Sequence, residues 1–334
     1  MKRDIGALVG REFDLVVVGG GIYGAAIAWD ATLAGLEVAL IERNDFGSGT
    51  SFNNLKTIHG GVRYLQHGDL KRIRESVRER RNLMRMAPHL VHPLPFLVPT
   101  YEGSLARSRA ALRFALLVND LASWDRNRGA RADKHLPPGR TLSRDECLKL
   151  APDLDAQGLT GGALWYDAQM YNSDRLTLSF VLSAAREGAA VANFVEAEGF
   201  LRSGSRVRGV SARDSIAGTK GLEIRGKLVV NASGPSVDRL LETIGPGRRK
   251  LFRSSKAMNL VTRPLVGNVA LGLTRGGPLL VIAPWRHVSL VGTLHLPYDG
   301  DPDGLEAEEA DVQRLLEGIN RAYPKAELVR SDVR

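Results

Sequence analysis

Residues 13–24 read FDLVVVGGGIYG, a short apolar run that leads directly into three glycines and then a fourth. β-Branched residues dominate this run, which is typical of a strand that is buried on both faces. Residues 22–34 have the alanine-rich composition of a helix, and Gly35 closes it. A second apolar run, residues 38–41, ends at Glu42. Strand, glycine turn, helix and strand within about thirty residues indicate a βαβ unit of an α/β fold.

The glycines of this turn have the spacing of a dinucleotide-binding motif. Gly19, Gly21 and Gly24 spell G-x-G-x-x-G, but glycine makes up 36 of the 334 residues, so the bare pattern is weak evidence. Its position after a buried strand and at the start of a helix strengthens it, because the helix N-terminus attracts phosphates. Glu42 can accept hydrogen bonds from a ribose diol, which argues against NADP but does not separate FAD from NAD. The alternative is an ordinary βαβ turn with a surface glutamate.

Composition bounds the class of protein. Hydrophobic residues make up 43% and charged residues 25%, which predicts a large soluble core. The single cysteine, Cys147, can form neither an internal disulfide nor a cysteine metal cluster, so we expect no metal site and a reduced, cytoplasmic setting. The net charge of +9 suits an anionic substrate, an anionic membrane surface or nucleic acid. No nucleic-acid motif accompanies it, and we expect no nucleic-acid partner.

Further elements follow from hydrophobic periodicity. Helices are predicted at residues 69–87, 104–124, 174–188 and 306–321. Strands are predicted at residues 190–195, 228–230, 257–262, 279–283 and 288–292. Leu70, Ile73, Val77, Met84 and Ala87 form one apolar stripe on the first of these helices. Prolines at 93, 95 and 99 are expected to break the following chain into extended or turning pieces.

Four further stretches identify a family. Residues 50–65 read TSFNNLKTIHGGVRYL, and their I-H-G-G-x-R-Y-L core resembles the flavin-contacting segment of FAD-dependent glycerol-3-phosphate dehydrogenases. Residues 86–90 (MAPHL) and 231–235 (NASGP) resemble two more motifs of that family. Gly292-Thr293 with residues 298–302 (YDGDP) resembles a fourth. The resemblance extends from about Asp14 to Arg334.

The resemblance implies a two-domain α/β fold. A Rossmann-like FAD-binding domain is built from separated segments, and an interleaved α+β substrate domain contains an antiparallel sheet. We expect residues 1–65 and 166–245 to form the FAD-binding domain, residues 66–165 a cap on the substrate side, and residues 246–334 an incomplete substrate domain.

The resemblance also implies a reaction. It is the oxidation of sn-glycerol 3-phosphate to dihydroxyacetone phosphate, with hydride transfer from carbon 2 to flavin N5 and electrons passed on to a quinone, or to oxygen in oxidases. Quinone reduction requires a membrane. The basic helices that begin near Asp69 and Ser104 are candidates for contact with the inner face of the cytoplasmic membrane, although both also suit solvated helix faces.

Site residues follow from the same motifs. For the cofactor they are Gly19, Gly21, Gly24, Glu42, Thr50, Ser51, Asn54, Lys56, Val195, Ala232 and Gly234. Arg63 and Arg334 are the candidates for the substrate phosphate, because guanidinium binds phosphate with a fork of donors. His59 is a candidate general base or a structural hydrogen-bonding group, and Tyr64 contacts substrate or packs.

The chain departs from the family at three places. The family's K-G-S-H segment reads Lys256-Ala257-Met258-Asn259, so Asn259 replaces a substrate-side histidine. The family's G-T-T-D reads G-T-L-H and ends at His295. Both changes leave open an FAD oxidase or dehydrogenase of another small hydroxy or amino acid. The family's S-G-V-R-P appears as residues 331–334, SDVR, after which relatives continue. A truncated reading frame, a split enzyme with a partner chain and an inactive nucleotide-binding remnant are the three explanations.

Overall fold

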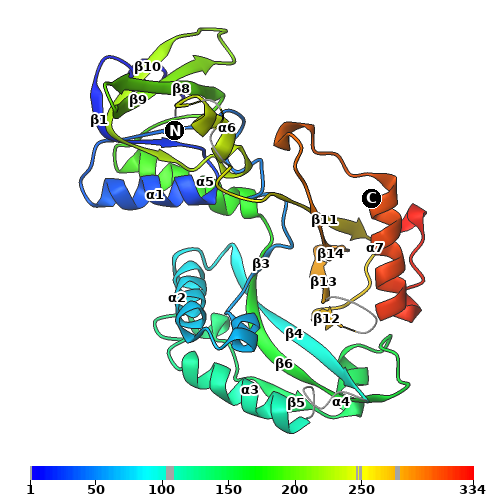
Figure 1. Cartoon of the computed structure of the whole chain (residues 1–334). Coiled ribbons are helices and arrows are strands. Elements are labelled where there is room, and N and C mark those ends of the chain that lie inside the picture. Colours follow the sequence, from blue (N-terminus) through cyan, green and yellow to red (C-terminus); the bar gives the residue numbers. More distant parts are fainter. Residues whose placement is uncertain (1, 103–108, 246, 248–249, 275–278) are drawn as a thin grey trace. The chain divides into compact units, whose positions relative to one another are not determined.

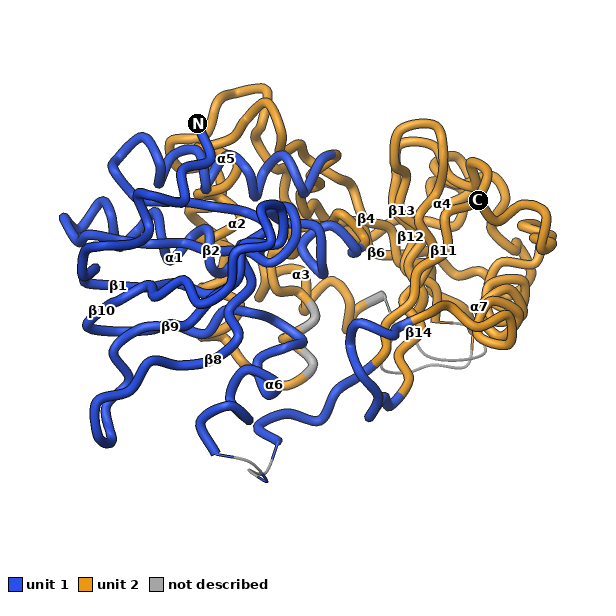
Figure 2. Tube along the Cα trace, turned by 90° about the horizontal axis from the view of Figure 1, so that it is seen from above, with its two compact units in different colours: residues 1–54, 172–255, 297–305 blue, residues 55–171, 256–296, 306–334 orange. Residues whose placement is uncertain are grey.

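Two compact units make up the chain. The computed structural model describes residues 2–102, 109–245, 247, 250–274 and 279–334, without the side chains of Arg63, Gln66 and Arg109 (Figure 1). Unit 1 consists of residues 1–54, 172–255 and 297–305, and unit 2 of residues 55–171, 256–296 and 306–334 (Figure 2). Each unit is therefore assembled from three separated segments.

A six-stranded sheet organises the described part of unit 1, in the order β7-β2-β1-β10-β9-β8. The strands are β1 (Glu12–Val18), β2 (Val38–Ile41), β7 (Ala190–Ala192), β8 (Val195–Ser203), β9 (Arg206–Asp214) and β10 (Leu222–Asn231). The first four in the sheet pair in parallel. β9 is antiparallel to both β10 and β8. The parallel half is the Rossmann-like arrangement that the βαβ pattern predicted.

Both faces of β1 are buried, as its β-branched composition predicted, because successive side chains of the strand point to opposite sides of the sheet. The helices of this unit are α1 (Ile22–Leu33), α5 (Ser173–Arg186) and α6 (Val237–Glu242). Leu15 and Val17 pack in one core with Ala28 of α1 and Val181 of α5, and α1 and α5 lie side by side along this face (Figure 1). Val16 belongs to a second core on the other face. The glycine turn after β1 is thereby fixed between two packed layers.

The sheet of unit 2 has the order β11-β14-β13-β12-β4-β6-β3 in the described residues, and β5 pairs with β6. Its strands are β3 (Thr57–Ile58), β4 (Val91–Tyr101), β5 (Arg140–Leu142), β6 (Leu159–Met170), β11 (Ser255–Thr262), β12 (Ala270–Leu273), β13 (Leu280–Trp285) and β14 (Val288–Pro297). Its helices are α2 (Leu70–Met86), α3 (Arg109–Ala122), α4 (Arg144–Leu150) and α7 (Glu309–Ala322). β12 and β4 pair in parallel. The pairs β12–β13, β13–β14, β3–β6, β4–β6 and β5–β6 are antiparallel. The predicted fold class, a Rossmann-like unit from separated segments with an interleaved α+β unit, is confirmed.

Helix α2 shows how the predicted apolar stripe is used. The Asp69 side chain accepts a hydrogen bond from the Arg72 backbone N–H at 3.0 Å and caps the helix. Ile73, Val77 and Met84 are buried, as predicted, while Leu70 is exposed. The same buried face also carries a charged residue, Arg80.

Two of the predicted elements differ from the structure. The stretch with prolines 93, 95 and 99 is one continuous strand, β4, which pairs with β6 along its whole length. These three prolines have the same parity, and successive N–H groups of a strand alternate sides, so the missing donors all fall on one edge. The predicted strand 190–195 is two strands, because Phe194 has a φ of 54° and turns the chain between β7 and β8. Residues 104–108 of the second predicted helix are outside the described residues.

Candidate active site

The glycine turn between β1 and α1 leaves no room for a side chain at two positions, Gly19 and Gly24. Gly19 has a φ of 107°, and a Cβ there would lie 2.4 Å from the Ala232 carbonyl oxygen. A Cβ on Gly24 would lie 1.8 Å from the Gly19 carbonyl oxygen. Glycine is therefore required at both positions, for the turn and for the close approach of helix and strand.

Ser51 lies at the N-terminus of α1, although it follows Ile22, the first residue of that helix, by 29 positions in sequence. Its hydroxyl oxygen accepts a hydrogen bond from the Ile22 backbone N–H at 2.9 Å. A Cβ on Gly21, the residue that precedes α1, would lie 3.1 Å from the same oxygen. Gly21 and Ser51 thus frame the end of the helix where the backbone dipole favours negative charge.

Glu42 lies immediately after β2, beside the glycine turn. One carboxylate oxygen accepts a hydrogen bond from the Gly20 N–H at 2.7 Å, and the other accepts one from the Asn44 N–H at 2.8 Å. The Val195 N–H donates to the Glu42 carbonyl at 2.8 Å, so the start of β8 is tied to the same strand end. The carboxylate is half-buried, which leaves it accessible to a ligand at this edge.

The end of β10 completes this edge of the sheet. The Ala232 N–H donates to the Val18 carbonyl at 2.8 Å, which brings residues 232–234 beside the glycine turn. Gly234 has a φ of 58° and begins a short 3-10 turn. The carboxyl ends of β2, β1 and β10 therefore meet at one place, which is where doubly wound sheets bind their ligands.

Thr50 and Asn54 lie in the loop that ends the first of the three segments of unit 1. The Asn54 side-chain amide donates to the Ser51 carbonyl at 2.9 Å and holds this loop in a compact turn. Thr50 is exposed in the same turn.

An ion-pair cluster that sequence reasoning missed lies next to Glu42. Arg43 donates two hydrogen bonds to the Asp303 carboxylate, one of them at 2.8 Å, and Arg239 of α6 donates a third at 2.6 Å. The hydrogen bond from Arg43, with help from Arg239, lowers the pKa of Asp303 to about 2 although partial burial opposes this shift. The only sequence signal was the position of Asp303 directly after the G-D-P motif.

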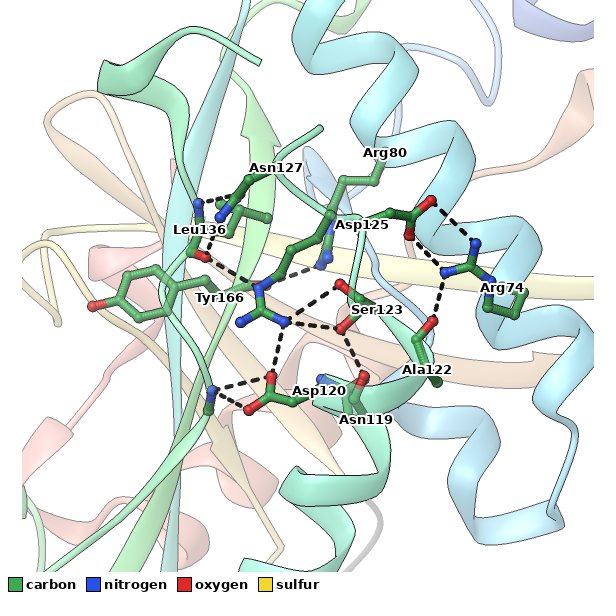
Figure 3. Close-up of polar contacts among 12 residues, drawn as sticks. Arg74, Arg80, Asn119, Asp120, Ala122, Ser123, Asp125, Asn127, Leu136 and Tyr166 are labelled. Carbon is green, nitrogen blue, oxygen red and sulfur yellow. Dashed lines mark hydrogen bonds and ion pairs between the residues drawn. The ribbon is translucent and has the colours of Figure 1, made fainter. Parts of the chain in front are cut away.

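In unit 2, His59 lies above a buried carboxylate. Its Nδ1 is 3.6 Å from Oδ2 of Asp167, and its side chain is 61% exposed while that of Asp167 is 4% exposed. Arg80 donates to Oδ1 of Asp167 at 2.6 Å, and the Gly60 N–H donates to the same oxygen at 2.6 Å. Arg80 also donates to the Tyr166 carbonyl at 2.9 Å (Figure 3). Neither Asp167 nor Arg80 was predicted. Two sequence signals could have indicated them: Arg80 has the helical spacing of the apolar stripe on α2, and Asp167 is an acidic residue within an apolar run.

Lys56 is almost fully buried, with 3% of its surface exposed. Its backbone has a φ of 59°, and its ammonium lies 5.5 Å from the centre of the Trp285 ring. Its carbonyl accepts a hydrogen bond from the Met170 N–H at 2.9 Å. Burial of an ammonium on an aromatic face is a cation–π arrangement, which fixes the side chain in place.

The remaining predicted substrate residues are distributed along unit 2. Tyr64 lies in the 3-10 helix Val62–His67, and its ring is 5.8 Å from the Arg72 guanidinium. The backbone of Arg63 belongs to the same turn, but its side chain is outside the described residues. Arg334 is exposed, and its backbone N–H donates to the Val261 carbonyl of β11 at 2.9 Å.

Asn259 and His295, which mark two of the three departures from the family motifs, have different surroundings. Asn259 accepts a hydrogen bond from the Thr293 hydroxyl at 2.8 Å. A Cβ on Gly292 would lie 2.2 Å from the same Asn259 oxygen, so glycine at 292 is needed for this contact. His295 is exposed on β14.

The described residues contain no group of three or more His, Cys, Asp or Glu side chains arranged to hold a metal ion. None of the helices in the described ranges has both the length and the apolar character needed to cross a bilayer.

Comparison with known proteins identifies the family. The model of the FAD dependent oxidoreductase family matches residues 14–334. The chain is 33% identical to a glycerol-3-phosphate dehydrogenase of Synechocystis sp. over 99% of its own length and 61% of the relative's. It is 33% identical to an alpha-glycerophosphate oxidase of Streptococcus pneumoniae over 97% of its length and 53% of the relative's. The chain thus spans somewhat more than half the length of these relatives.

A solved structure agrees with this match. The glycerol-3-phosphate dehydrogenase from Bacillus halodurans, complexed with FAD, superposes with a TM-score of 0.77 at 28% identity, covering 98% of this chain and 56% of the other. The family model matches nearly the whole chain, and the chain belongs to the FAD-dependent oxidoreductase family.

Proposed function

We propose that unit 1 binds FAD through the edge where β2, β1 and β10 end. The observation that carries this proposal is a glycine turn in which the backbone leaves no room for a Cβ at Gly19 or Gly24, combined with a carboxylate at the tip of the next strand. That combination suits a diphosphate beside a ribose diol. The residues of the chain therefore fit the adenosine diphosphate half of the cofactor.

Each predicted cofactor residue has a role in this proposal. Gly19, Gly21 and the Ser51 hydroxyl would hold the pyrophosphate at the N-terminus of α1. Glu42 would exchange its bond to the Gly20 N–H for bonds to the ribose hydroxyls. The backbone at Val195 would flank the adenine, while the backbone at Ala232 and Gly234 would border the pyrophosphate.

Residues after the βαβ unit would contact the flavin half. Thr50, Asn54 and Lys56 are the polar candidates, and the charge of Lys56 would favour an anionic ring. When bound, the flavin supplies an acceptor for a hydride. The chain's own residues would hold the substrate and receive the proton.

The substrate that we propose is sn-glycerol 3-phosphate. Arg63 and Arg334 would bind its phosphate, because a dianionic group requires several donors. Tyr64 would donate a hydrogen bond to the substrate. His59 would accept the proton of the hydroxyl on carbon 2 while that carbon loses its hydrogen as a hydride, which yields dihydroxyacetone phosphate. The names of the related dehydrogenases and oxidases support this assignment.

A membrane quinone is the electron acceptor that we propose, reached by peripheral contact of α3 with the membrane. Phe114, Leu117, Leu121 and Trp124 have helical spacing and are all exposed, Trp124 by 71%. Arg113 beside them is also exposed, whereas Asp120 of this helix binds the Gly139 N–H at 3.0 Å. This apolar face carries a basic residue, Arg113, while the acidic residue of the helix, Asp120, is already engaged in a hydrogen bond. Such a face suits an anionic lipid surface.

Flavin absorbance tests the proposal. Protein purified in the presence of FAD is expected to be yellow, and anaerobic addition of glycerol 3-phosphate is expected to bleach it. A colourless preparation that gains no flavin bands with added FAD would identify a remnant without cofactor. The rate at which the reduced flavin regains its colour on addition of a soluble quinone analogue, which is reduced to the quinol, is then compared with the rate on addition of oxygen, and this comparison separates dehydrogenase from oxidase.

A second substrate class has one observation in its favour. Asn259 cannot titrate, and it is engaged by the Thr293 hydroxyl, so this part of unit 2 differs from the histidine of the family motif. An FAD enzyme acting on another small hydroxy or amino acid is the alternative. Bleaching by such compounds, but not by glycerol 3-phosphate, would favour it.

A further inference from the structure

We propose that Asp167 and Arg80 form a buried positioning pair that sets the orientation and tautomer of His59. The pair itself is a structural assignment, and its contribution to turnover rests on the proposed function, in which His59 accepts a proton.

Each carboxylate oxygen of Asp167 faces different partners. Oδ1 accepts hydrogen bonds from Arg80 and from the Gly60 N–H, both at 2.6 Å. Oδ2 accepts one from the Trp165 indole at 3.1 Å and faces Nδ1 of His59 at 3.6 Å. Oδ1 is thus used to anchor the carboxylate, and Oδ2 is directed to the imidazole.

Glycine at position 60 makes this arrangement possible. A Cβ on Gly60 would lie 2.0 Å from a guanidinium nitrogen of Arg80, so any other residue would displace the arginine from beneath the loop. Gly61 has a φ of 89°, and a Cβ there would lie 2.9 Å from the Ile73 Cα of α2. The H-G-G sequence therefore brings His59 directly over the arginine of α2.

The buried carboxylate is ionised. Burial alone would raise the pKa of Asp167, but His59, the Arg80 guanidinium and the Gly60 N–H outweigh it and lower that pKa. Arg80 is 5% exposed at its side chain and remains the buried counter-charge. A pair this deep costs stability to desolvate, which makes a role beyond stability a reasonable hypothesis for its presence.

The geometry has a chemical consequence for His59. A carboxylate facing Nδ1 favours the proton on Nδ1 in the neutral ring, which leaves the lone pair of Nε2 free. The exposed side of the imidazole is then the acceptor. In the proposed reaction Nε2 would accept the proton as the substrate O–H bond breaks, and the bound flavin would supply the acceptor for the hydride that leaves carbon 2.

Nitrogen NMR of the histidines tests the pair without any turnover. The full chain, labelled with ¹⁵N at its seven histidines, is recorded at alkaline pH, where an ordinary imidazole is neutral. His59→Gln assigns the resonance. The expected result is an Nδ1-protonated His59 in the wild type and a loss of that preference in Asp167→Asn. A wild-type ring protonated mainly on Nε2, or an unchanged tautomer in Asp167→Asn, would overturn the proposal.

Asp125→Asn is the matched control. Asp125 is also buried and also accepts hydrogen bonds from arginines of α2. Arg74 donates to it at 2.6 Å (Figure 3), and Arg81 donates to its other carboxylate oxygen. Removing its charge disturbs the same helix, but among the described side chains no hydrogen bond or ion pair joins Asp125 to His59. The control is expected to leave the His59 tautomer unchanged. A tautomer change of equal size in this variant would reduce the Asp167 effect to general destabilisation of α2.

Kinetics measured per bound flavin test the functional half. Asp167→Asn is expected to lower kcat roughly a hundredfold with little change in KM, because substrate binding is retained and proton acceptance is impaired. An activity loss that is fully explained by loss of bound flavin, so that kcat per flavin is unchanged, would contradict a positioning role. A change in KM alone would also contradict it. If the wild type is not reduced by glycerol 3-phosphate, the proposed function fails, whereas the tautomer measurement still decides the pair.

Discussion

Arg43 and Asp303 form a two-pronged ion pair across 260 residues of sequence, within one compact unit. Arg43 directly follows Glu42, the carboxylate at the tip of β2, and Arg239 of α6 binds the same aspartate. The pair therefore connects the loop 297–305 to the edge of the sheet where we propose that FAD binds. Its consequences can be measured as stability and as cofactor affinity.

The stability contributed by Asp303 should depend on pH. Its folded pKa is about 2, below the ordinary value of 3.8, because Arg43 and Arg239 favour the charged form. A depressed pKa stabilises the fold above the unfolded value, and this contribution is lost as pH falls from about 4 towards about 2. Because the pair is partly exposed, Asp303→Asn is expected to cost only about 0.2–1 kcal/mol at neutral pH. Urea unfolding at pH values above and inside this window measures the difference, and a gap that widens on acidification would contradict the prediction.

Alanine at position 24 should be poorly tolerated. The added Cβ of Gly24→Ala meets the Gly19 carbonyl oxygen at 1.8 Å, so β1 and α1 must separate. Overpacking of this kind typically costs about 1–3 kcal/mol, and we expect FAD retention to fall with it. Gly304→Ala is the control in the same unit, since nothing lies within 4 Å of its Cβ. Thermal unfolding and flavin content measure both, and equal behaviour of the two variants would argue against the tight turn.

Glu42→Ala should weaken FAD binding. The proposal assigns the ribose hydroxyls to this carboxylate, and a hydrogen bond to a charged group contributes roughly 1.5–3 kcal/mol, or about tenfold to hundredfold in Kd. Glu37→Ala removes a carboxylate of the same unit that is more exposed, with Arg11 4.0 Å away. Flavin titration by fluorescence measures both affinities. Unchanged FAD affinity in the Glu42 variant would place the ribose elsewhere.

Serine substitutions on α3 should abolish membrane contact. Phe114→Ser with Leu121→Ser removes two apolar side chains that are 67% and 66% exposed, so the fold loses little packing while the lipid-facing area shrinks. Co-sedimentation of the double variant with anionic vesicles is expected to be lower than that of the wild type. Co-sedimentation of the wild type is expected to decrease when salt is added. Ile216→Ser, at an exposed position of unit 1, is the control. Wild-type binding that is equal for zwitterionic and anionic vesicles, or absent, would contradict the assignment.

Local patterns predicted several elements correctly because local chemistry decides them. The apolar run of β1, the glycine turn and α1 follow from residues that are adjacent in sequence, and the stripe on α2 follows from helical spacing. The family motifs added the class of cofactor. The roles of the individual site residues remain predictions.

Strand β4 shows where the local rules failed. Three prolines within seven residues normally end regular structure, yet β6 pairs with the whole strand. A partner strand decides whether missing donors matter, and each of these prolines pairs with a residue more than sixty positions further along the chain.

The sequence by itself determined the βαβ unit, the glycine cradle and the family, since each depends on neighbours within one turn or one strand. The tertiary structure alone decided that Arg80 meets Asp167 beneath His59, that Ser51 reaches the start of α1, and that Asp303 binds Arg43. Contacts of this second kind join residues from 29 to 260 positions apart. Such contacts form between residues that the packing of the sheets brings together, and no periodicity in the sequence indicates them.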